Sequence, residues 1–224
     1  MTAGLDGSMV LSVRSKRSLK KEQAMTGKET RDRIVDATLA VLKRQGYAGA
    51  SARSIAAEGA FNQALIFYHF GSVRNVLLAA LDRTSADRMA AYRAAAAGAD
   101  DIPALVAVAA TIYREDLASG HITVIAELIS GASADPELGP EIVARITPWI
   151  DFAREQIERV AGGTPLGTLV PAEDAAYAIV AQFLGLELLT HLDGSTERAE
   201  RLFRLAGSFA GMLALGAQPS GGVR

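Results

Sequence analysis

The segment Ser51-Ala-Arg-Ser-Ile-Ala-Ala-Glu-Gly-Ala-Phe-Asn-Gln-Ala-Leu-Ile-Phe-Tyr-His-Phe70 decides the fold. It predicts two short helices of about two turns each, joined by a tight turn at 58–61. Ser51 and Asn62 are residue types that helix N-caps favour, so each is expected to begin one of these helices. Because such short helices are not stable alone, they need longer helices packed on both sides. The pattern is that of a helix-turn-helix.

The flanking sequence supplies those longer helices. One is predicted over 29–45 and another after Ser72, and each carries apolar residues at helical spacing along one face. Further helices are predicted from Ile102 to Gly120, over 122–130, over 142–160 with Pro148 expected to kink or split it, after Pro171, and at the chain's end. No alternating strand pattern occurs. The sequence therefore predicts an all-α fold of about nine helices.

The charge is unevenly distributed along the 224 residues, although the formal net charge is only -2. Residues 1–83 contain 13 basic and 7 acidic side chains, whereas residues 84–224 contain 10 basic and 18 acidic ones. Such a division indicates a nucleic-acid or membrane-surface element in the basic part. A second interpretation is that these charges only solvate exposed faces. The chain has no cysteine, which excludes disulfides, thiol nucleophiles and cysteine-ligated metals.

The segment 28–82 resembles the N-terminal domain of TetR-family transcriptional regulators. The matching residues include Ile55-Ala56 in the first short helix and His69-Phe70-Gly71-Ser72 at the end of the second, with Gly46-Tyr47 after the first long helix. The resemblance implies three parts: a disordered basic arm at 1–27, a helix-turn-helix DNA-binding domain at 28–75, and an effector-binding and dimerisation domain at 76–224. Met25 is a candidate alternative start, which would leave residues 1–24 outside the native protein.

Several positions depart from the family pattern. Gly59-Ala60 inverts the usual Ala-Gly, and Phe61 replaces a valine. Phe67 stands where a phosphate-binding tyrosine is common, and Val73 replaces a lysine, so Arg74 is the expected substitute contact. These departures keep open a second hypothesis, a helical scaffold or interaction protein with a degenerate reading head.

A DNA-reading role is expected for the second short helix and its surroundings. Gln63 can read adenine, and the small Ala64 allows close approach to a base. Tyr68 and His69 have polar tips suited to phosphate contacts, while Arg53 fits either a backbone contact or a solvated charge. The expected DNA-binding residues are Ser51, Arg53, Asn62, Gln63, Ala64, Tyr68, His69 and Arg74.

The resemblance also implies a small-molecule pocket, a two-fold dimer and a palindromic double-stranded DNA operator. The apolar character of the second domain favours a hydrophobic or amphipathic effector. Candidate effector-binding residues are Tyr113, His121, Glu127, Trp149 and Phe152, and the alternative interpretation of each as a core or surface residue stays open. Between Asp174 and Glu187 the chain carries no charge, so this helix is expected to be buried on more than one face. Candidate dimer residues are Ala178, Ala181, Phe183, Leu184, Gly185, Leu188 and Phe209.

The third hypothesis is an all-α enzyme, and the sequence contains little that supports it. No catalytic motif, phosphate loop or dinucleotide fingerprint occurs, so no catalytic residue and no cofactor are predicted. The three histidines have no metal-ligand spacing, and no metal site is expected. The apolar part of the uncharged run 205–223 is shorter than a membrane span, and the start of the chain lacks a signal sequence. We therefore expect a cytoplasmic homodimer without a membrane partner.

Overall fold

The computed structural model describes residues 27–163 and 165–216, and the expected basic arm lies outside them apart from its last residue. The described residues form ten helices and no strand, which confirms the all-α class; the prediction was about nine helices. They are α2 (Gly27–Gly49), α3 (Ala52–Glu58), α4 (Ala64–Phe70), α5 (Val73–Ala96), α6 (Ile102–Ser119), α7 (His121–Ala132), α8 (Leu138–Ala161), α9 (Pro165–Leu169), α10 (Ala172–Asp193) and α11 (Glu197–Gly216).

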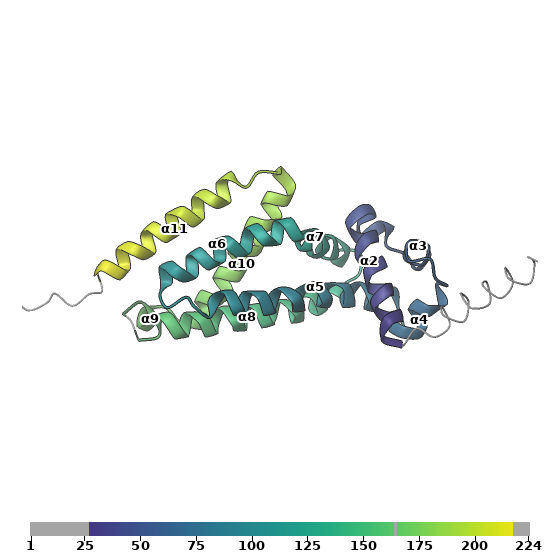
Figure 1. The fold of residues 1–224 in the computed structure, drawn as a ribbon, viewed down its shortest axis with the longest axis horizontal. Coiled ribbons are helices and arrows are strands. Elements are labelled where there is room, and N and C mark those ends of the chain that lie inside the picture. The colour runs from purple at the N-terminus through teal and green to yellow at the C-terminus, as the bar shows by residue number, and fades with distance from the viewer. Residues whose placement is uncertain (1–26, 164, 217–224) are drawn as a thin grey trace, which may run out of the picture.

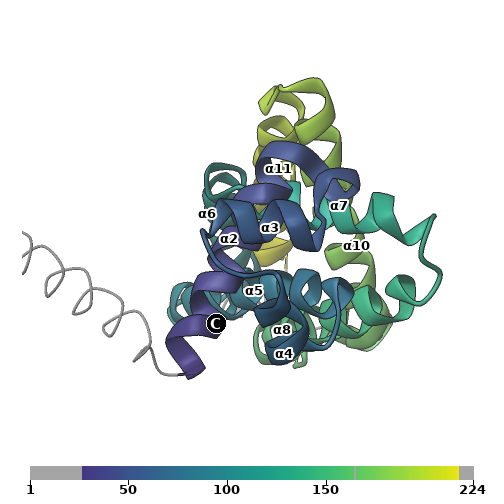
Figure 2. The same ribbon diagram turned by 90° about the vertical axis from the view of Figure 1, so that its right-hand side faces the viewer.

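The molecule is elongated, with α2, α3 and α4 gathered at one end (Figure 1). Helix α5 leaves this end and runs alongside α8 through the body, with α6 and α7 above them and α11 outermost. Viewed along the long axis, α2 and α3 lie in front of the other helices (Figure 2). Helix α10 packs mainly on α8, and α11 packs mainly on α6. The two ends of the molecule therefore have separate surfaces joined by long helices.

The helix boundaries follow from capping chemistry. The Ser51 hydroxyl accepts a hydrogen bond from the Ser54 backbone N–H at 3.1 Å, and the Ser54 hydroxyl accepts one from the Ser51 N–H at 2.9 Å. This reciprocal pair satisfies two otherwise unpaired donors. Ser72 caps α5 by accepting from the Asn75 N–H at 3.1 Å. Gly120 ends α6 with a φ of 72° in the left-handed region, where glycine has no steric penalty.

The main core joins the helix-turn-helix to the body. Ile34, Val41 and Leu42 of α2 are buried together with Ile55 of α3 and Ile66 of α4. The same cluster continues into α5, α7 and the start of α8. Helix α5 also crosses the expected domain boundary at 75–76. The two expected domains therefore share one helix and one core.

Two local predictions need correction. Pro148 does not split the helix over 138–161, which continues through it. The segment after it contains a further short helix, α9, which the sequence did not predict. Leu138 and Ile142 before the proline and Phe152 after it are all buried, so the packing of the apolar face outweighs the local cost of the proline.

The turn between α3 and α4 explains the inverted Gly59-Ala60 pair. A Cβ added at Gly59 would lie 2.2 Å from the Phe61 ring, so the larger side chain at position 61 requires glycine at 59. Ala60 adopts a φ of 51°, a left-handed conformation that costs a side-chain-bearing residue about 1–2 kcal/mol. Arg33 holds this strained turn by donating hydrogen bonds to the carbonyl oxygens of Gly59 and Ala60, both at 2.9 Å.

Ala60→Gly is expected to raise the free energy of unfolding by about 0.5–1 kcal/mol. The gain is the relief of left-handed strain less the greater chain entropy of glycine in the unfolded state. Urea unfolding followed by circular dichroism measures it. The matched change Gly59→Ala should destabilise by about 1–3 kcal/mol through overpacking against Phe61. A neutral or destabilising Ala60→Gly would contradict the strain.

Candidate functional site

The second short helix, α4, presents one face to solvent and the other to the core. Ile66 and Phe70 are one turn apart and buried, and they fix the helix to α2 and α5. Tyr68 lies on the opposite side and is 81% exposed, with Phe67 beside it at 50%. Two large aromatic side chains left in solvent by so short a helix serve no packing purpose. They mark a surface available for a partner.

Most of the expected DNA-binding residues share this surface. Arg53, Gln63 and Ala64 are exposed, and His69 is half-buried with its ring 4.9 Å from that of Tyr68. Ser51 is exposed while it caps α3. The Asn62 side-chain oxygen accepts a hydrogen bond from the Ala64 N–H at 2.9 Å. The backbone behind them is held by Arg31, whose guanidinium donates to the His69 carbonyl oxygen and lies 4.2 Å from the centre of the Phe70 ring.

Arg74 is placed differently from its expected role. Its guanidinium donates hydrogen bonds to the Asp135 carboxylate at 2.6 and 3.0 Å, and it also pairs with Glu137. The hydrogen bonds that Arg74 donates to Asp135 and then to Glu137 raise the pKa of Arg74. The side chain is thus committed to the α7–α8 segment rather than free to reach a phosphate. Sequence reasoning missed this because the two acids lie about sixty residues further along the chain.

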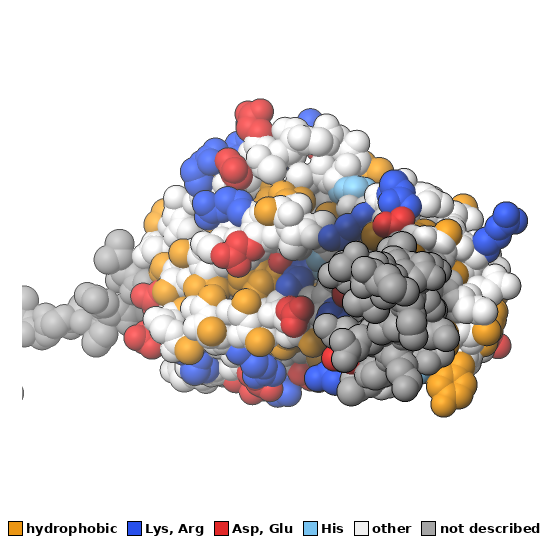
Figure 3. All heavy atoms as spheres, turned by 45° about the vertical axis from the view of Figure 1, so that its right-hand side comes forward, with side chains coloured by type: hydrophobic (Ala, Val, Ile, Leu, Met, Phe, Trp, Pro, Cys, Tyr) orange, Lys and Arg blue, Asp and Glu red, His pale blue; other side chains and the backbone are white. Residues whose placement is uncertain are grey.

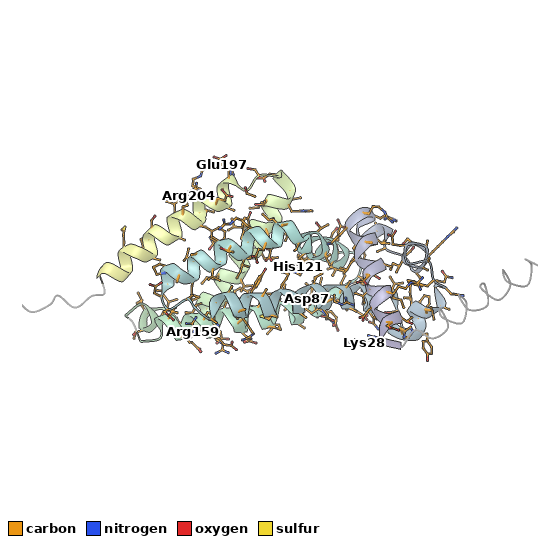
Figure 4. All side chains as sticks on the ribbon, viewed as in Figure 1. Lys28, Asp87, His121, Arg159, Glu197 and Arg204 are labelled. Atoms are coloured by element: carbon orange, nitrogen blue, oxygen red, sulfur yellow. The ribbon has the colours of Figure 1, made fainter. Side chains whose placement is uncertain are left out.

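The second candidate site is a cavity of about 540 Å³ inside the helical body. Its walls come from α5, α6, α8, α10 and α11, with residues from α7 at one end, and they are mostly apolar. The volume lies within the range of small-molecule sites. Three of the candidate effector-binding residues, His121, Trp149 and Phe152, line the cavity. Figure 4 labels His121 at the junction of α6 and α7, where it faces α5.

Two of the predicted effector-binding residues do not line the cavity. Tyr113 is fully buried, and its hydroxyl is hydrogen-bonded to that of Thr190. Glu127 accepts a hydrogen bond from the Tyr47 N–H at 2.8 Å. This carboxylate satisfies backbone at the kink of α2, where Gly46 has a φ of 69°. Both side chains are therefore structural, Tyr113 between helices and Glu127 at the junction of body and helix-turn-helix.

A buried charged cluster in the cavity wall was missed by sequence reasoning. Arg88 of α5 forms an ion pair with Asp116 of α6, and its Nη2 lies 3.9 Å from Glu187 Oε1 of α10. Tyr92 donates a hydrogen bond to Asp116 and accepts one from Arg88. The Arg88 guanidinium lies 5.4 Å from the centre of the Tyr92 ring and 5.7 Å from that of Trp149. Both carboxyl side chains are nearly inaccessible to solvent.

Burial dominates the protonation of these groups. It raises the pKa of Asp116 and that of Glu187. The charge of Glu187 and a hydrogen bond between the two carboxyls raise the pKa of Asp116 further, whereas the hydrogen bond lowers the pKa of Glu187. The two interacting carboxyls therefore share one proton at neutral pH, and Arg88 neutralises the charge that remains on the pair. Burial, then the charges of Arg88 and Lys43, lower the pKa of His121 to about 3. Its neutral ring is bonded through Nδ1 to the Thr84 hydroxyl at 2.8 Å.

The sequence does contain a pattern from which the two buried acids could have been predicted. Asp116 continues the apolar stripe of α6, four residues after Ile112, and Glu187 follows Phe183 by the same interval on α10. A charge on an otherwise buried stripe indicates a paired or functional group. The pairing itself could not be predicted, because the three residues come from helices that are far apart in the chain.

The predicted dimer residues divide between two surroundings. Ala178, Ala181 and Phe209 are exposed, and Gly185 has open space beside it. Phe183 and Leu184 instead line the cavity, and Leu188 packs partly against the main core. The sequence did not single out several exposed apolar side chains on the same two helices, including Tyr177, Leu189, Leu192, Leu205 and Met212.

Helix α10, which carries no charge between Asp174 and Glu187, is not buried on more than one face within this chain, so the predicted burial would need cover from outside the chain. Only Ala176, Glu187 and Thr190 are buried in it. In the described part of the chain it is also the single unbroken helix long and apolar enough to cross a membrane, and the bent pair α4–α5 passes the same test of length and composition. Figure 3 shows hydrophobic side chains reaching the surface among charged ones on one face of the molecule.

The comparison with protein families identifies the helix-turn-helix. Residues 34–80 match the family described as bacterial regulatory proteins, tetR family. Over these residues the chain is similar to the DNA-binding domain of the tetR family. The match covers α3, α4 and the adjoining parts of α2 and α5, which is the region whose exposed aromatic face is described above. TetR-family proteins are transcriptional regulators rather than enzymes, and they bind DNA and small-molecule effectors.

Solved structures extend the similarity to the whole fold. A transcriptional regulator from Pseudomonas aeruginosa PAO1 aligns with 87% of this chain and 95% of its own, at 22% identity and a TM-score of 0.70. A TetR-family regulator from Rhodococcus sp. aligns with 82% and 98%, at 21% identity and a TM-score of 0.67. A regulator from Saccharomonospora viridis in complex with choline aligns with 81% and 95%, at 20% identity and a TM-score of 0.64. Among curated protein sequences, none is significantly similar.

Proposed function

We propose that this chain is a dimeric repressor of the TetR family, which a small amphipathic effector releases from a palindromic operator. The observation that carries the proposal is the solvent-facing side of α4, where Tyr68, Gln63 and Ala64 stand exposed on a helix anchored by Ile66 and Phe70. A short helix presented in this way suits the major groove. The same core continues into helices that wall the cavity.

Helix α7 supports a coupling between cavity and DNA surface. At its start His121 lines the cavity, and further along Glu127 accepts the hydrogen bond from Tyr47 of α2. Gly131 lies so close to the Tyr47 ring that a Cβ there would be 2.5 Å from it. Lys43 of α2 adds a hydrogen bond to the Ser119 carbonyl oxygen at 3.0 Å. An effector that moved α7 would move α2 with it, which changes the separation of two reading heads.

The exposed faces of α10 and α11 support the dimer. Among the described residues, eight of the fourteen large hydrophobic side chains that are exposed lie on these two helices. A two-fold axis through this surface would bury it and carry two α4 helices to half-sites about one DNA turn apart, ~34 Å. We expect the dimer to be cytoplasmic.

The cavity supports a small-molecule effector. It is lined mostly by apolar side chains, and its polar lining residues are Arg88, Asp116, His121, Gln156, Gln182 and Glu187. One similar structure, from Saccharomonospora viridis, is in complex with choline. An effector that binds one conformation of the dimer better than another would shift the population away from the DNA-bound form.

Tyr68→Ala is expected to lower affinity for operator DNA and for unrelated DNA by a similar factor of about ten, because a phosphate contact carries no sequence information. Gln63→Ala should weaken operator binding about 5- to 100-fold and leave unrelated DNA almost unaffected. Fluorescence anisotropy with a duplex from upstream of the protein's own gene and a scrambled duplex measures both. Tyr68→Phe is the matched control, which retains the ring and removes only the hydroxyl.

The second hypothesis, a scaffold with a degenerate reading head, rests on Phe67 in place of a tyrosine and Val73 in place of a lysine. The salt dependence of DNA binding distinguishes this hypothesis from the repressor. Operator binding through phosphates weakens linearly in log–log form as salt rises, because bound counterions are released. If neither duplex binds with such a dependence, and Tyr68→Ala changes nothing, the scaffold hypothesis replaces the repressor.

A further inference from the structure

The charged end of the cavity has one more acid than it has bases. Arg88 faces two carboxyls, Asp116 and Glu187, and all three line the cavity. Burial of two ionised carboxylates beside one guanidinium would leave a net negative charge in an apolar enclosure, which is costly. In the empty cavity a proton on one carboxyl removes that charge. A second cation would do the same.

The hydrogen bonding of the cluster is also incomplete. Glu187 is only 3% exposed and lines the cavity, yet its Oε1 has no hydrogen-bond donor and lies 3.9 Å from Arg88 Nη2. Asp116 Oδ1 accepts the Tyr92 hydrogen bond, whereas its Oδ2 lies in the Arg88 ion pair and, like Glu187 Oε1, has no hydrogen-bond partner. Buried polar atoms are nearly always satisfied, so an unused acceptor in a cavity wall points to a ligand's donor.

We propose that the cavity binds an amphipathic amine, whose protonated nitrogen donates to Glu187 beside Asp116 and whose apolar body lies along α6, α8 and α10. This inference rests on the proposed effector cavity and names the chemical class of the effector. The aromatic rings of Trp149 and Tyr92 border the same end of the cavity. They supply π faces that favour a cation.

Binding of the amine releases one proton from the cluster. An ammonium ion enters, the carboxyl proton shared by Asp116 and Glu187 leaves for solvent, and no covalent bond to carbon changes. Because the carboxyl pKa values are raised by burial, that proton is bound at neutral pH and its release makes affinity increase with pH. The other titratable or charged groups around the cluster are Arg88 and Tyr92 on α5, Tyr113 on α6, His121 on α7 and Lys43 on α2.

An anionic effector would show the opposite pH dependence of affinity. A carboxylate could use Arg88 Nη1, which is buried and also lacks a hydrogen-bond partner. It would add a third acid to the cluster, so Glu187 would have to take up a proton on binding. Affinity for such a ligand would fall as pH rises.

The test uses decylamine, decanol and decanoate, which share an alkyl chain and differ in headgroup. Trp149 is the only tryptophan in the chain and lines the cavity, so its fluorescence reports occupancy without DNA. We expect decylamine to bind at least about tenfold more tightly than either other probe. Its affinity should rise about tenfold or more between about pH 6 and pH 8. Calorimetry in buffers of different ionisation enthalpy should show proton release.

Substitutions locate the effect. Glu187→Gln and Asp116→Asn keep side-chain size, and each should abolish the preference for decylamine over decanol while decanol still binds. Glu115→Gln, an exposed acid one residue from Asp116, is the matched control and should change neither affinity. Equal binding of decylamine and decanol, or tighter decanoate binding that weakens as pH rises, overturns the amine.

Failure of this inference is distinguishable from failure of the proposed function. If decylamine binds with proton release and leaves the protein–DNA complex intact, the amine site stands and the effector role of the cavity fails. If the protein binds its operator with sequence preference and no alkylamine perturbs Trp149 fluorescence, the regulator stands and the amine fails.

Discussion

Replacing Tyr177 and Phe209 together by glutamate should turn the dimer into a monomer and reduce operator affinity by at least about a hundredfold. These side chains are 64% and 62% exposed on α10 and α11, the helices that hold most of the exposed apolar surface. In a two-fold dimer the pair introduces four buried charges, and the dimer dissociation constant should rise about a thousandfold or more. Loss of the second reading head then removes the avidity between half-sites.

The matched control is Val143→Glu. Val143 is 62% exposed, as Phe209 is, but lies on α8 among charged neighbours. It should leave both the oligomeric state and DNA binding unchanged. Sedimentation velocity measures the oligomeric state, and fluorescence anisotropy measures DNA binding. A double variant that remains dimeric would exclude α10 and α11 as the interface.

Arg88→Met should destabilise the fold by about 3–5 kcal/mol near neutral pH, because it leaves two buried carboxyls without a cation. The guanidinium is 13% exposed and Asp116 only 2%. Both carboxyls must then be neutral when folded, whereas they ionise on unfolding. Their raised folded-state pKa values mean that stability is retained at low pH and lost as pH rises. The deficit should therefore grow by up to about 1.4 kcal/mol per pH unit above about pH 5.

Denaturant unfolding of Arg88→Met at several pH values measures this loss. Arg93→Met on the same helix is the control, since Arg93 pairs at the surface with Glu155 at 2.9 Å and should cost at most about 1 kcal/mol. Adding Asp116→Asn and Glu187→Gln to Arg88→Met should recover much of the stability. A small deficit that is independent of pH would mean that the cluster is not buried as described.

The sequence was most informative where structure is local. Ser51, Ser72 and Gly120 mark helix ends through their own backbone geometry, and all three predictions are confirmed. Apolar residues at helical spacing identified the core faces of α2 and α5. Pro148 does not split its helix, because packing of a long apolar face outweighs the local effect of the proline.

The exposed surface of α4 was predicted better than the cavity, because sequence is informative where structure is local. The exposed residues of α4 lie within a few positions of one another, so their common surface follows from helical geometry. The cavity instead collects side chains from helices separated by up to a hundred residues, and sequence spacing gives no distance between them. Tyr113 and Glu127 have the chemistry of ligand contacts, but long-range hydrogen bonds to Thr190 and Tyr47 determine their roles.

The measurement that tests the central claim most directly is the affinity of the full chain for duplex DNA from upstream of its own gene. Fluorescence anisotropy at two salt concentrations, with a scrambled duplex of equal length as competitor, separates sequence preference from general attraction to phosphate. A sequence-specific regulator should prefer its operator by about a thousandfold or more. Equal affinity for the two duplexes at both salt concentrations would contradict a DNA-reading role for α4 at that site.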